Sequence, residues 1–148
     1  MSIIKTIYVD ILDYPVIAHC ISVDAAMDAG LALQVARKYP FLSNQIRSKK
    51  LSPGDVFIYE GENQTIFNIC PKNFYWQHVG NGISNEEYIA NLKKGLDFTF
   101  AYLIEKKKPT LWVPRLGCGL DRCYWPDVVK LFANTEINII VVEREDGK

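Results

Sequence analysis

The feature of this sequence that most limits its fold is a set of short apolar runs rich in β-branched residues. Residues 110–114 (TLWVP) and 137–143 (INIIVVE) are two such runs, and a helix pattern with Pro126 in its first turn separates them. Near-continuous apolar runs are typical of strands buried on both faces. Their alternation with helices predicts an α/β fold with a mixed central sheet and helices on both faces.

The first half of the chain adds more strands and one helix. Residues 5–12 and 16–23 predict two strands joined by a turn, and residues 54–70 predict a β-hairpin. Between these strands, residues 29–39 have helical periodicity, which Pro40 ends.

The best helix pattern begins after Ser84, which forms a capping box with Glu87. Four apolar residues recur along one face of this helix: Leu92, Leu96, Phe100 and Leu103. By contrast, residues 71–83 are polar and aromatic and show no usable periodicity.

Composition narrows the classes of protein. The chain has 148 residues, 49% of them hydrophobic, which predicts one domain over residues 1–148. Seventeen basic residues balance seventeen acidic ones, so no net charge attracts the chain to nucleic acid or to an anionic membrane. A secretory signal pattern and a bilayer-spanning apolar run are both absent from the sequence. We therefore expect a cytoplasmic or nuclear protein that is not secreted.

Four cysteines, Cys20, Cys70, Cys118 and Cys123, lack the C-x-x-C spacing of a zinc or redox site. We expect reduced thiols and no bound metal. Cys20 and Cys70 lie in apolar strand patterns and are predicted to be small buried residues.

A glycine-rich turn follows the strand at residues 110–114. In Gly117-Cys118-Gly119, consecutive backbone N–H groups can converge on an anion such as phosphate. A tight turn that requires positive φ angles explains the glycines equally well. Asp121 favours a ligand site, because a carboxylate beside a bound phosphate is repelled unless it has a role such as proton transfer.

Three other segments reach the same edge of the predicted sheet. Asp10 ends a strand and can accept a hydrogen bond from an amine such as that of adenine, although turn capping is the alternative. Residues 24–30 could present a helix N-terminus to the ligand, or Asp28 could simply cap that helix. Lys72 follows the second hairpin strand and is a nucleophile if desolvated, but a surface lysine otherwise.

Aromatic residues crowd the segment after the hairpin. We expect Phe74, Tyr75 and Trp76 to fold back over the core, and the alternative is a lid that stacks on a base or a sugar. His19, within an apolar strand pattern, is predicted to be a hydrogen-bonded interior residue, whereas His78 is a candidate base.

Three motifs carry a family resemblance: AHCISVDAAMDAGLA (residues 18–32), IFNICPK (66–72) and VPRLGCGLDRCYW (113–125). In this order and spacing they resemble the macro domains that bind ADP-ribose. The likeness is greatest to the branch of the TARG-type terminal ADP-ribose protein glycohydrolases and the DNA ADP-ribosylation antitoxins. It implies a three-layer α/β/α fold over nearly the whole chain.

The resemblance also implies a set of site residues. Asp10 and Ile11 would hold the adenine, and Lys72 and Asp121 fall where hydrolytic members carry their catalytic lysine and aspartate. The residues implied around the diphosphate and the distal ribose are His19, Cys20, Ile21, Ser22, Ala29, Gly30, Leu31, Arg115, Gly117, Cys118, Gly119 and Leu120.

The activity that the resemblance implies is release of ADP-ribose from a glutamate or aspartate ester on a protein, with Lys72 as nucleophile and Asp121 as general acid/base. A DNA base is an alternative acceptor, although the balanced charge argues against it. A non-catalytic ADP-ribose reader and a phosphatase for ADP-ribose phosphate are further alternatives. No cofactor, metal or membrane is implied, and we expect a monomer.

Three departures from the family pattern bear on these expectations. The chain has Met27-Asp28-Ala29-Gly30 where the family has Met-Gly-Ala-Gly, which puts a negative side chain near the expected diphosphate. Residues 73–83 are longer and more aromatic than in the protein-directed relative, so substrate choice is open. The Asn-Ala-Ala-Asn run and triple glycine of the larger macro-domain branch are absent, so its mechanism does not carry over.

Overall fold

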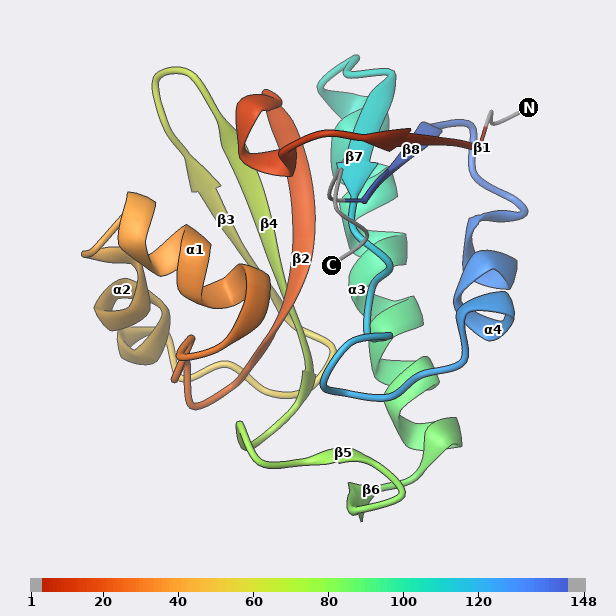
Figure 1. Ribbon diagram of the computed structural model, residues 1–148. Helices are drawn as coiled ribbons and strands as arrows, with labels where there is room; N and C mark the ends of the chain where they lie inside the picture. The colour runs from red at the N-terminus through yellow and green to blue at the C-terminus, as the bar shows by residue number, and fades with distance from the viewer. Residues whose placement is uncertain (1–3, 144–148) are drawn as a thin grey trace.

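A computed structural model describes residues 4–143 as a six-stranded mixed sheet (Figure 1). The strand order is β1-β8-β7-β2-β4-β3, and only β3 runs antiparallel to its neighbour. The bounds are β1 Ile4–Tyr8, β2 Val16–Ser22, β3 Val56–Glu60, β4 Thr65–Lys72, β7 Thr110–Val113 and β8 Asn138–Glu143. The predicted α/β class with a mixed sheet is confirmed.

Helices cover both faces of the sheet, which makes three layers. The helices α1 (Gly30–Lys38) and α2 (Leu42–Ser48) lie on one side, and α3 (Asn85–Glu105) and α4 (Trp125–Val129) lie on the other (Figure 1). The remaining elements are short: η1 (Ile11–Asp13), η2 (Lys130–Phe132), β5 (His78–Val79) and β6 (Gly82–Ile83).

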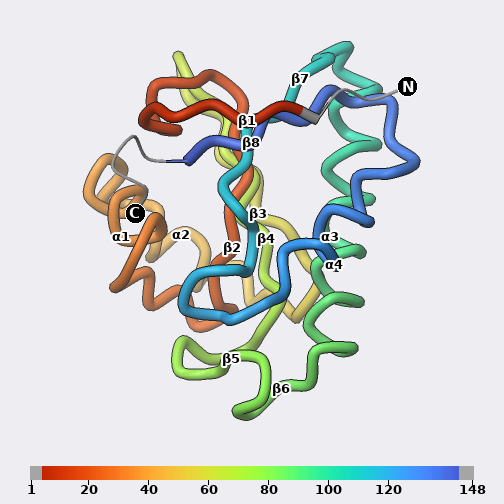
Figure 2. Tube along the Cα trace, turned by 45° about the vertical axis from the view of Figure 1, so that its right-hand side comes forward, coloured from red at the N-terminus to blue at the C-terminus, as the bar shows by residue number. Residues whose placement is uncertain are grey.

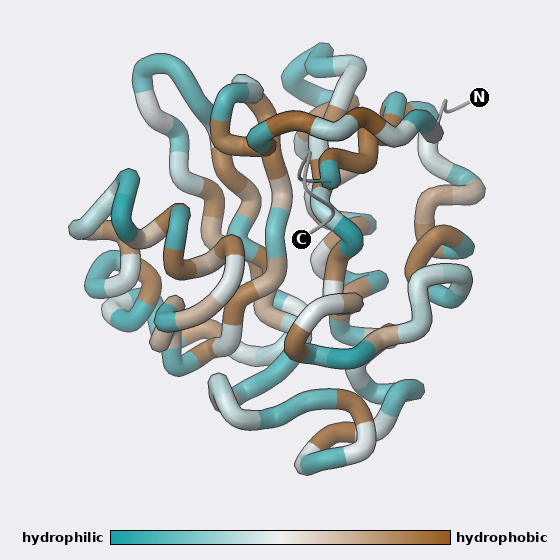
Figure 3. Tube along the Cα trace, viewed as in Figure 1, coloured by the Kyte–Doolittle hydropathy of each residue, from teal (hydrophilic) through white to brown (hydrophobic). Residues whose placement is uncertain are grey.

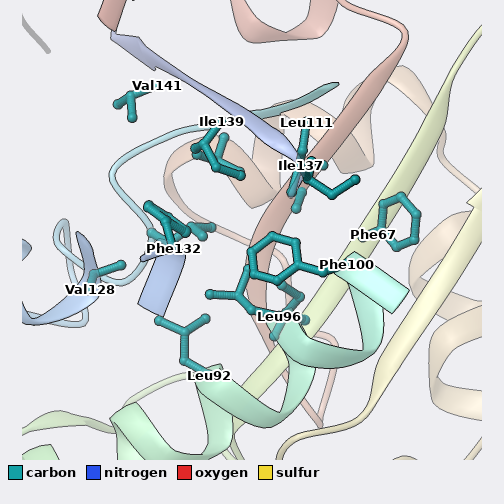
Figure 4. Close-up of a cluster of buried hydrophobic side chains, with 14 of the residues drawn as sticks. Phe67, Leu92, Leu96, Phe100, Leu111, Val128, Phe132, Ile137, Ile139 and Val141 are labelled. Carbon is teal, nitrogen blue, oxygen red and sulfur yellow. The ribbon is translucent and has the colours of Figure 1, made fainter. Parts of the chain in front are cut away.

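The core between the sheet and α3 follows the predicted periodicity. Leu92, Leu96, Phe100 and Leu103 are buried in one cluster with strand residues such as Leu111 and Ile139. Figure 4 shows Leu92, Leu96 and Phe100 within this cluster. The Ser84 hydroxyl accepts a hydrogen bond from the Glu87 amide and caps α3, which is one of the two hydrogen bonds of the predicted capping box. Each such side chain contributes about 1.5–3 kcal/mol when fully buried, so this face fixes α3 against the sheet.

A second core lies between the other face of the sheet and α1 and α2. Ile17 and Ile66 from the strands pack with Val35, Leu42 and Ile46 from the two helices. Figure 3 agrees with this layering, since hydrophobic stretches concentrate on the central strands while the tip of the β3–β4 hairpin is hydrophilic.

Several local expectations need correction. The first two strands are separated in the sheet by β8 and β7, and η1 takes the place of the predicted turn between them. Neither α2 nor the small β5–β6 sheet was predicted, because both lack a strong apolar period. Pro126 does lie in the first turn of α4, but the helix passes into η2 after Val129 because of its 3₁₀ hydrogen bonding.

The topology brings five strand ends together. Because β1, β8, β7, β2 and β4 are parallel, their carboxyl ends lie at one edge of the sheet, at Tyr8, Glu143, Val113, Ser22 and Lys72. Ligands of α/β proteins bind beyond this edge. Within residues 4–143, no helix has the length and apolarity to cross a bilayer.

Candidate active site

A cleft of about 1140 Å³ opens beyond this edge of the sheet. It collects every site residue that the family resemblance implies, from Asp10 in the first strand–helix connection to Asp121 after β7. The residues that line it without having been predicted as site residues are Val9, Met27, Asp28, Ala32, Gln34, Tyr75, Pro114, Leu116, Val142 and Glu143. The topology thus brings together motifs that are far apart in the sequence.

Lys72 and Asp121 form a largely buried ion pair in the lining of this cleft. The Lys72 Nζ lies 2.5 Å from Asp121 Oδ1, and Lys72 is only 6% exposed. The same Nζ also donates to the carbonyl oxygens of Gln77 at 2.9 Å and Tyr75 at 3.1 Å. Three acceptors match the three N–H bonds of an ammonium group, so the arrangement is that of a charged lysine balanced by a carboxylate. The surface-lysine alternative is therefore excluded.

The glycine-rich loop after β7 has a conformation that requires one of its glycines. Gly117 has φ +72°, and a Cβ there would lie 2.9 Å from a ring carbon of Tyr88. At Gly119 the backbone does not need glycine, and a Cβ would meet nothing within 4 Å. The loop turns on itself through the amides of Cys118, Arg122 and Cys123. In the described part of the chain, the amides of Gly119 and Leu120 donate to no protein acceptor.

The loop between β2 and α1 is held in an unusual conformation. Ala25 and Met27 have φ values of +52° and +46°, and both are buried. The Ser43 hydroxyl of α2 donates to the Ala25 carbonyl oxygen at 2.9 Å, so the unpredicted helix pins this loop. Left-handed residues other than glycine are costly and concentrate at functional sites. Asp28 is exposed and does not cap α1, whose N-cap is Ala29, so the capping alternative is wrong.

His19 is an interior residue, as predicted. Its Nε2 lies 2.6 Å from Asn68 Oδ1, and the Asn68 amide donates to the Phe57 carbonyl oxygen. Burial lowers the pKa of His19 to about 4, against a smaller opposing effect of the Asn68 hydrogen bond. The imidazole is therefore neutral, with the proton on Nε2, and Nδ1 is the buried side-chain polar atom without a partner in the described chain.

The aromatic segment after β4 does not fold back over the core, so that expectation is wrong. Phe74, Tyr75 and Trp76 are each at least half exposed, and Phe74 stacks on Trp76 with 5.9 Å between ring centroids. The segment is ordered by polar contacts instead. The buried Gln77 side chain accepts from the Asn73 and Phe74 amides and donates to the Gly82 carbonyl oxygen.

This aromatic segment lies beside the glycine-rich loop, as Figures 1 and 2 both show. The Val79 amide of β5 donates to the Asp121 carbonyl oxygen at 2.9 Å. The two loops thus form one wall next to the Lys72–Asp121 pair. His78 contacts the Val79 carbonyl oxygen through Nδ1 and does not line the cleft.

At the opposite end of the cleft, Asp10 caps a turn. Its Oδ1 accepts from the Leu12 amide at 2.9 Å, which is the turn-capping alternative, yet the residue also lines the cleft. Arg115 lies at the rim, where its Nε is 3.1 Å from Glu143 and its guanidinium stands over the Trp125 ring. Both side chains of this ion pair are partly exposed, so it contributes little stability.

The cysteines offer neither a disulfide nor a metal site. All four are free, and burial raises the pKa of Cys118 to about 11 against the opposing effect of Arg115. A thiol of this kind is a poor nucleophile. Within residues 4–143 no three His, Cys, Asp or Glu side chains are grouped so that they could hold a metal ion.

Sequence reasoning missed two side chains that support the pair. Tyr88 of α3 donates its hydroxyl to Asp121 Oδ2, and Gln77 orders the segment that supplies carbonyl acceptors to Lys72. The sequence did contain an indication of the role of Tyr88: its hydroxyl lies on the mainly apolar face predicted for this helix, and a buried hydroxyl needs a hydrogen-bond partner.

The three-layer fold with a cleft beyond five parallel strand ends defines an α/β protein of the macrodomain type. No protein-family model matches the chain. Human ADP-ribose glycohydrolase OARD1 is 30% identical over 129 residues, which cover 84% of this chain and 79% of that protein. The macrodomain of Mycobacterium tuberculosis DarG has a TM-score of 0.77 at 20% identity and covers 97% of this chain and 99% of its own.

A third similar structure is Thermosipho africanus DarTG in complex with ADP-ribose, with a TM-score of 0.77 at 17% identity. It covers all of this chain and 43% of its own. The chain belongs to the macro domain family, and it fits the branch that contains OARD1 and the DarG macrodomains.

Proposed function

We propose that this protein is an ADP-ribosyl hydrolase that releases ADP-ribose from a modified acceptor, a glutamate or aspartate ester on a protein. The observation that carries this proposal is the largely buried Lys72–Asp121 pair in the lining of the cleft. A protein that only bound ADP-ribose would have no need of a desolvated lysine there, since burying an ammonium without a partner costs on the order of several kcal/mol.

The cleft has properties that suit ADP-ribose. Human OARD1 is an ADP-ribose glycohydrolase, and Thermosipho DarTG binds ADP-ribose. In this chain, the backbone amides of Gly119 and Leu120 suit the diphosphate, and the open space at the Gly119 Cβ position permits close approach of a ligand. Asp10 at the far end suits the adenine amine.

The first half of the reaction frees and uses the lysine amine. Asp121 accepts a proton from the Lys72 ammonium across the 2.5 Å contact. The amine then bonds to C1″ of the distal ribose, the C1″–oxygen bond to the acceptor breaks, and the acceptor carboxylate leaves with the bonding electrons. The ribose ring opens as one proton passes from the nitrogen to the ring oxygen, which leaves a protonated Schiff base.

The second half returns the enzyme to its starting state. Water adds to C1″, the C1″–nitrogen bond breaks, and both water protons end on the lysine nitrogen. Lys72 is again an ammonium, ADP-ribose leaves as an aldehyde that recloses, and Asp121 gives its proton to solvent. The sum is hydrolysis of one ester bond with release of one proton.

A second candidate acceptor is an ADP-ribosylated DNA base. The exposed Phe74–Trp76 pair favours it, because base stacking on an aromatic side chain is worth about 1–3 kcal/mol per base. The absence of net positive charge argues against it.

One assay separates these possibilities. Glutamate-linked ADP-ribosyl protein and thymidine-linked ADP-ribosyl DNA are offered side by side, and free ADP-ribose is quantified. We expect release from the protein substrate, and preferred release from DNA would move the assignment to the second candidate. Binding of ADP-ribose without release from either substrate would identify a non-catalytic reader.

Variants of the pair complete the test. Lys72→Met and Asp121→Ala should each lower the rate of ADP-ribose release by at least about 10³-fold, which is the order of the loss when a nucleophile or its base is removed. The matched control is Lys93→Met, which breaks a pair of similar length, 2.6 Å to Asp97, on the exposed face of α3. Unchanged turnover in Asp121→Ala would refute the assignment.

A further inference from the structure

The packing of α3 does not require a tyrosine at position 88. It lies in the first turns of α3 on the buried face, is 0% exposed, and packs in the same core as Leu92. A phenylalanine would fill the same volume there. The hydroxyl therefore needs an explanation other than packing, because a buried hydroxyl costs free energy unless it is hydrogen-bonded.

The partner of this hydroxyl is the proposed acid/base. The Tyr88 hydroxyl donates to Asp121 Oδ2, whereas Lys72 donates to Asp121 Oδ1. Each carboxylate oxygen thus has one fixed donor, from α3 and from β4. With two anchored oxygens, the carboxylate plane cannot rotate without losing a hydrogen bond.

Tyr88 also contacts the loop that carries Asp121. Its ring leaves too little room for a Cβ at Gly117, since a ring carbon lies 2.9 Å and the hydroxyl oxygen 3.1 Å from the position that this Cβ would take. One side chain from α3 thereby fixes both the course of the glycine-rich loop and the orientation of its carboxylate. Neither OH nor ring lines the cleft, so Tyr88 acts through Asp121.

The ionisable groups around Asp121 come from several elements. They are Lys72 of β4, Tyr88 of α3, Cys20 of β2 and Cys123 of the same loop. Burial raises the pKa of Tyr88 and of Cys20 well above their usual values, and it raises the pKa of Cys123 to about 12. The tyrosine therefore stays a neutral donor at physiological pH.

We propose that Tyr88 is a positioning residue for the reaction: its hydroxyl orients Asp121 toward Lys72 and stabilises the carboxylate form that accepts the lysine proton. This inference rests on the proposed hydrolase activity. A hydrogen bond to the charged form of an acid makes the acid harder to protonate.

The test compares Tyr88→Phe with Tyr102→Phe, a half-buried tyrosine on the same helix that does not contact Asp121. For Tyr88→Phe we expect kcat to fall by roughly ten- to a hundred-fold at neutral pH, with KM changed less than about two-fold. The acidic limb of the pH–rate profile should move to higher pH, because the variant lacks the hydrogen bond to the carboxylate. Tyr102→Phe should show neither effect.

A second modification guards against a folding defect in Tyr88→Phe. A difluorotyrosine placed at position 88 keeps the ring and makes the hydroxyl a stronger donor, so the acidic limb should move to lower pH. A purely structural role would not move the limb in opposite directions in the two variants. Unchanged pH profiles in both, or an equal fall in kcat for Tyr102→Phe, would overturn the proposal.

A readout without turnover separates this inference from the hydrolase proposal. The Asp121 carboxyl carbon resonance is followed against pH in the wild type and in Tyr88→Phe, with ADP-ribose binding as a check of folding. A higher titration midpoint in the variant supports the contact even if no substrate is hydrolysed, in which case only the hydrolase proposal fails. Equal midpoints in a folded variant would refute the role of Tyr88.

Discussion

Removal of Asp121 should destabilise the protein, because it leaves a buried charge behind. Lys72 is 6% exposed and would retain only two carbonyl acceptors after Asp121→Ala. Breaking a buried ion pair from one side costs about 3–5 kcal/mol. Two carbonyl acceptors remain for Lys72, and the site of the Asp121 side chain is partly open to the cleft. We therefore expect Asp121→Ala to lower the free energy of unfolding by about 2–3 kcal/mol.

Removal of Lys72, the other member of the pair, should lower the free energy of unfolding by less. Lys72→Met removes the charge itself and leaves Asp121 with the Tyr88 hydroxyl and access to cleft water, so we expect about 1 kcal/mol. In the double variant, the free energy of unfolding should fall by about as much as in Lys72→Met alone. The coupling energy of the cycle is then about 2–3 kcal/mol.

Urea denaturation at pH 7, followed by tryptophan fluorescence, measures each corner of this cycle. Thermal unfolding is the second measurement. The midpoint temperature Tm changes by about 2–4 °C per kcal/mol, so Asp121→Ala should lower Tm by roughly 4–12 °C. The exposed Lys93–Asp97 pair is the control, and its coupling should stay below about 0.5 kcal/mol. If Asp121→Ala raised the stability, or if the Lys72–Asp121 coupling were as small as that of the control, the buried ion pair would be refuted.

Three further predictions concern the cleft and its surroundings. Gly117→Ala should cost about 2–3 kcal/mol, from its φ of +72° and the contact with Tyr88, whereas Gly119→Ala should change stability by less than about 0.5 kcal/mol yet weaken ADP-ribose binding in calorimetry. Equal destabilisation by both would contradict the loop geometry. Because burial lowers the pKa of His19 to about 4, the unfolded chain binds a proton that the native state does not. The free energy of unfolding should therefore fall by about 3 kcal/mol between pH 6.5 and 4, and His19→Gln should remove this part of the pH dependence in urea titrations. Asp28→Asn should tighten ADP-ribose binding about two- to five-fold at low salt and less at high salt; no salt dependence of the gain would show that Asp28 lies far from the diphosphate.

Local patterns predicted the elements that build the site. The capping box at Ser84, the hairpin around residues 61–63 and the glycine-rich turn each have a sequence signature that depends only on neighbouring residues. Short elements such as α2 and β5 could not be predicted in this way, since contacts with the rest of the chain stabilise them. The hydroxyl of Ser43 and the Gln77 side chain are examples of such contacts.

The aromatic segment illustrates the limit of composition. Hydrophobic side chains usually become buried, so Phe74 and Trp76 were expected to pack on the core. Gln77 instead occupies the buried position and satisfies the backbone of the turn, which directs the rings outward. Which of two neighbouring side chains is buried depends on the register of a tight turn, and the hydrophobic periodicity of the sequence does not indicate that register.

The sequence by itself determined the α/β class, the macrodomain resemblance and the positions of Lys72 and Asp121 after two strands, because strand period, turn chemistry and motif spacing are local properties. Only the tertiary structure decided that these two residues, 49 positions apart, form an ion pair, and that Tyr88, 33 positions from Asp121, holds the same carboxylate. The physical reason is that the parallel order of the strands and the packing of α3 set which side chains meet.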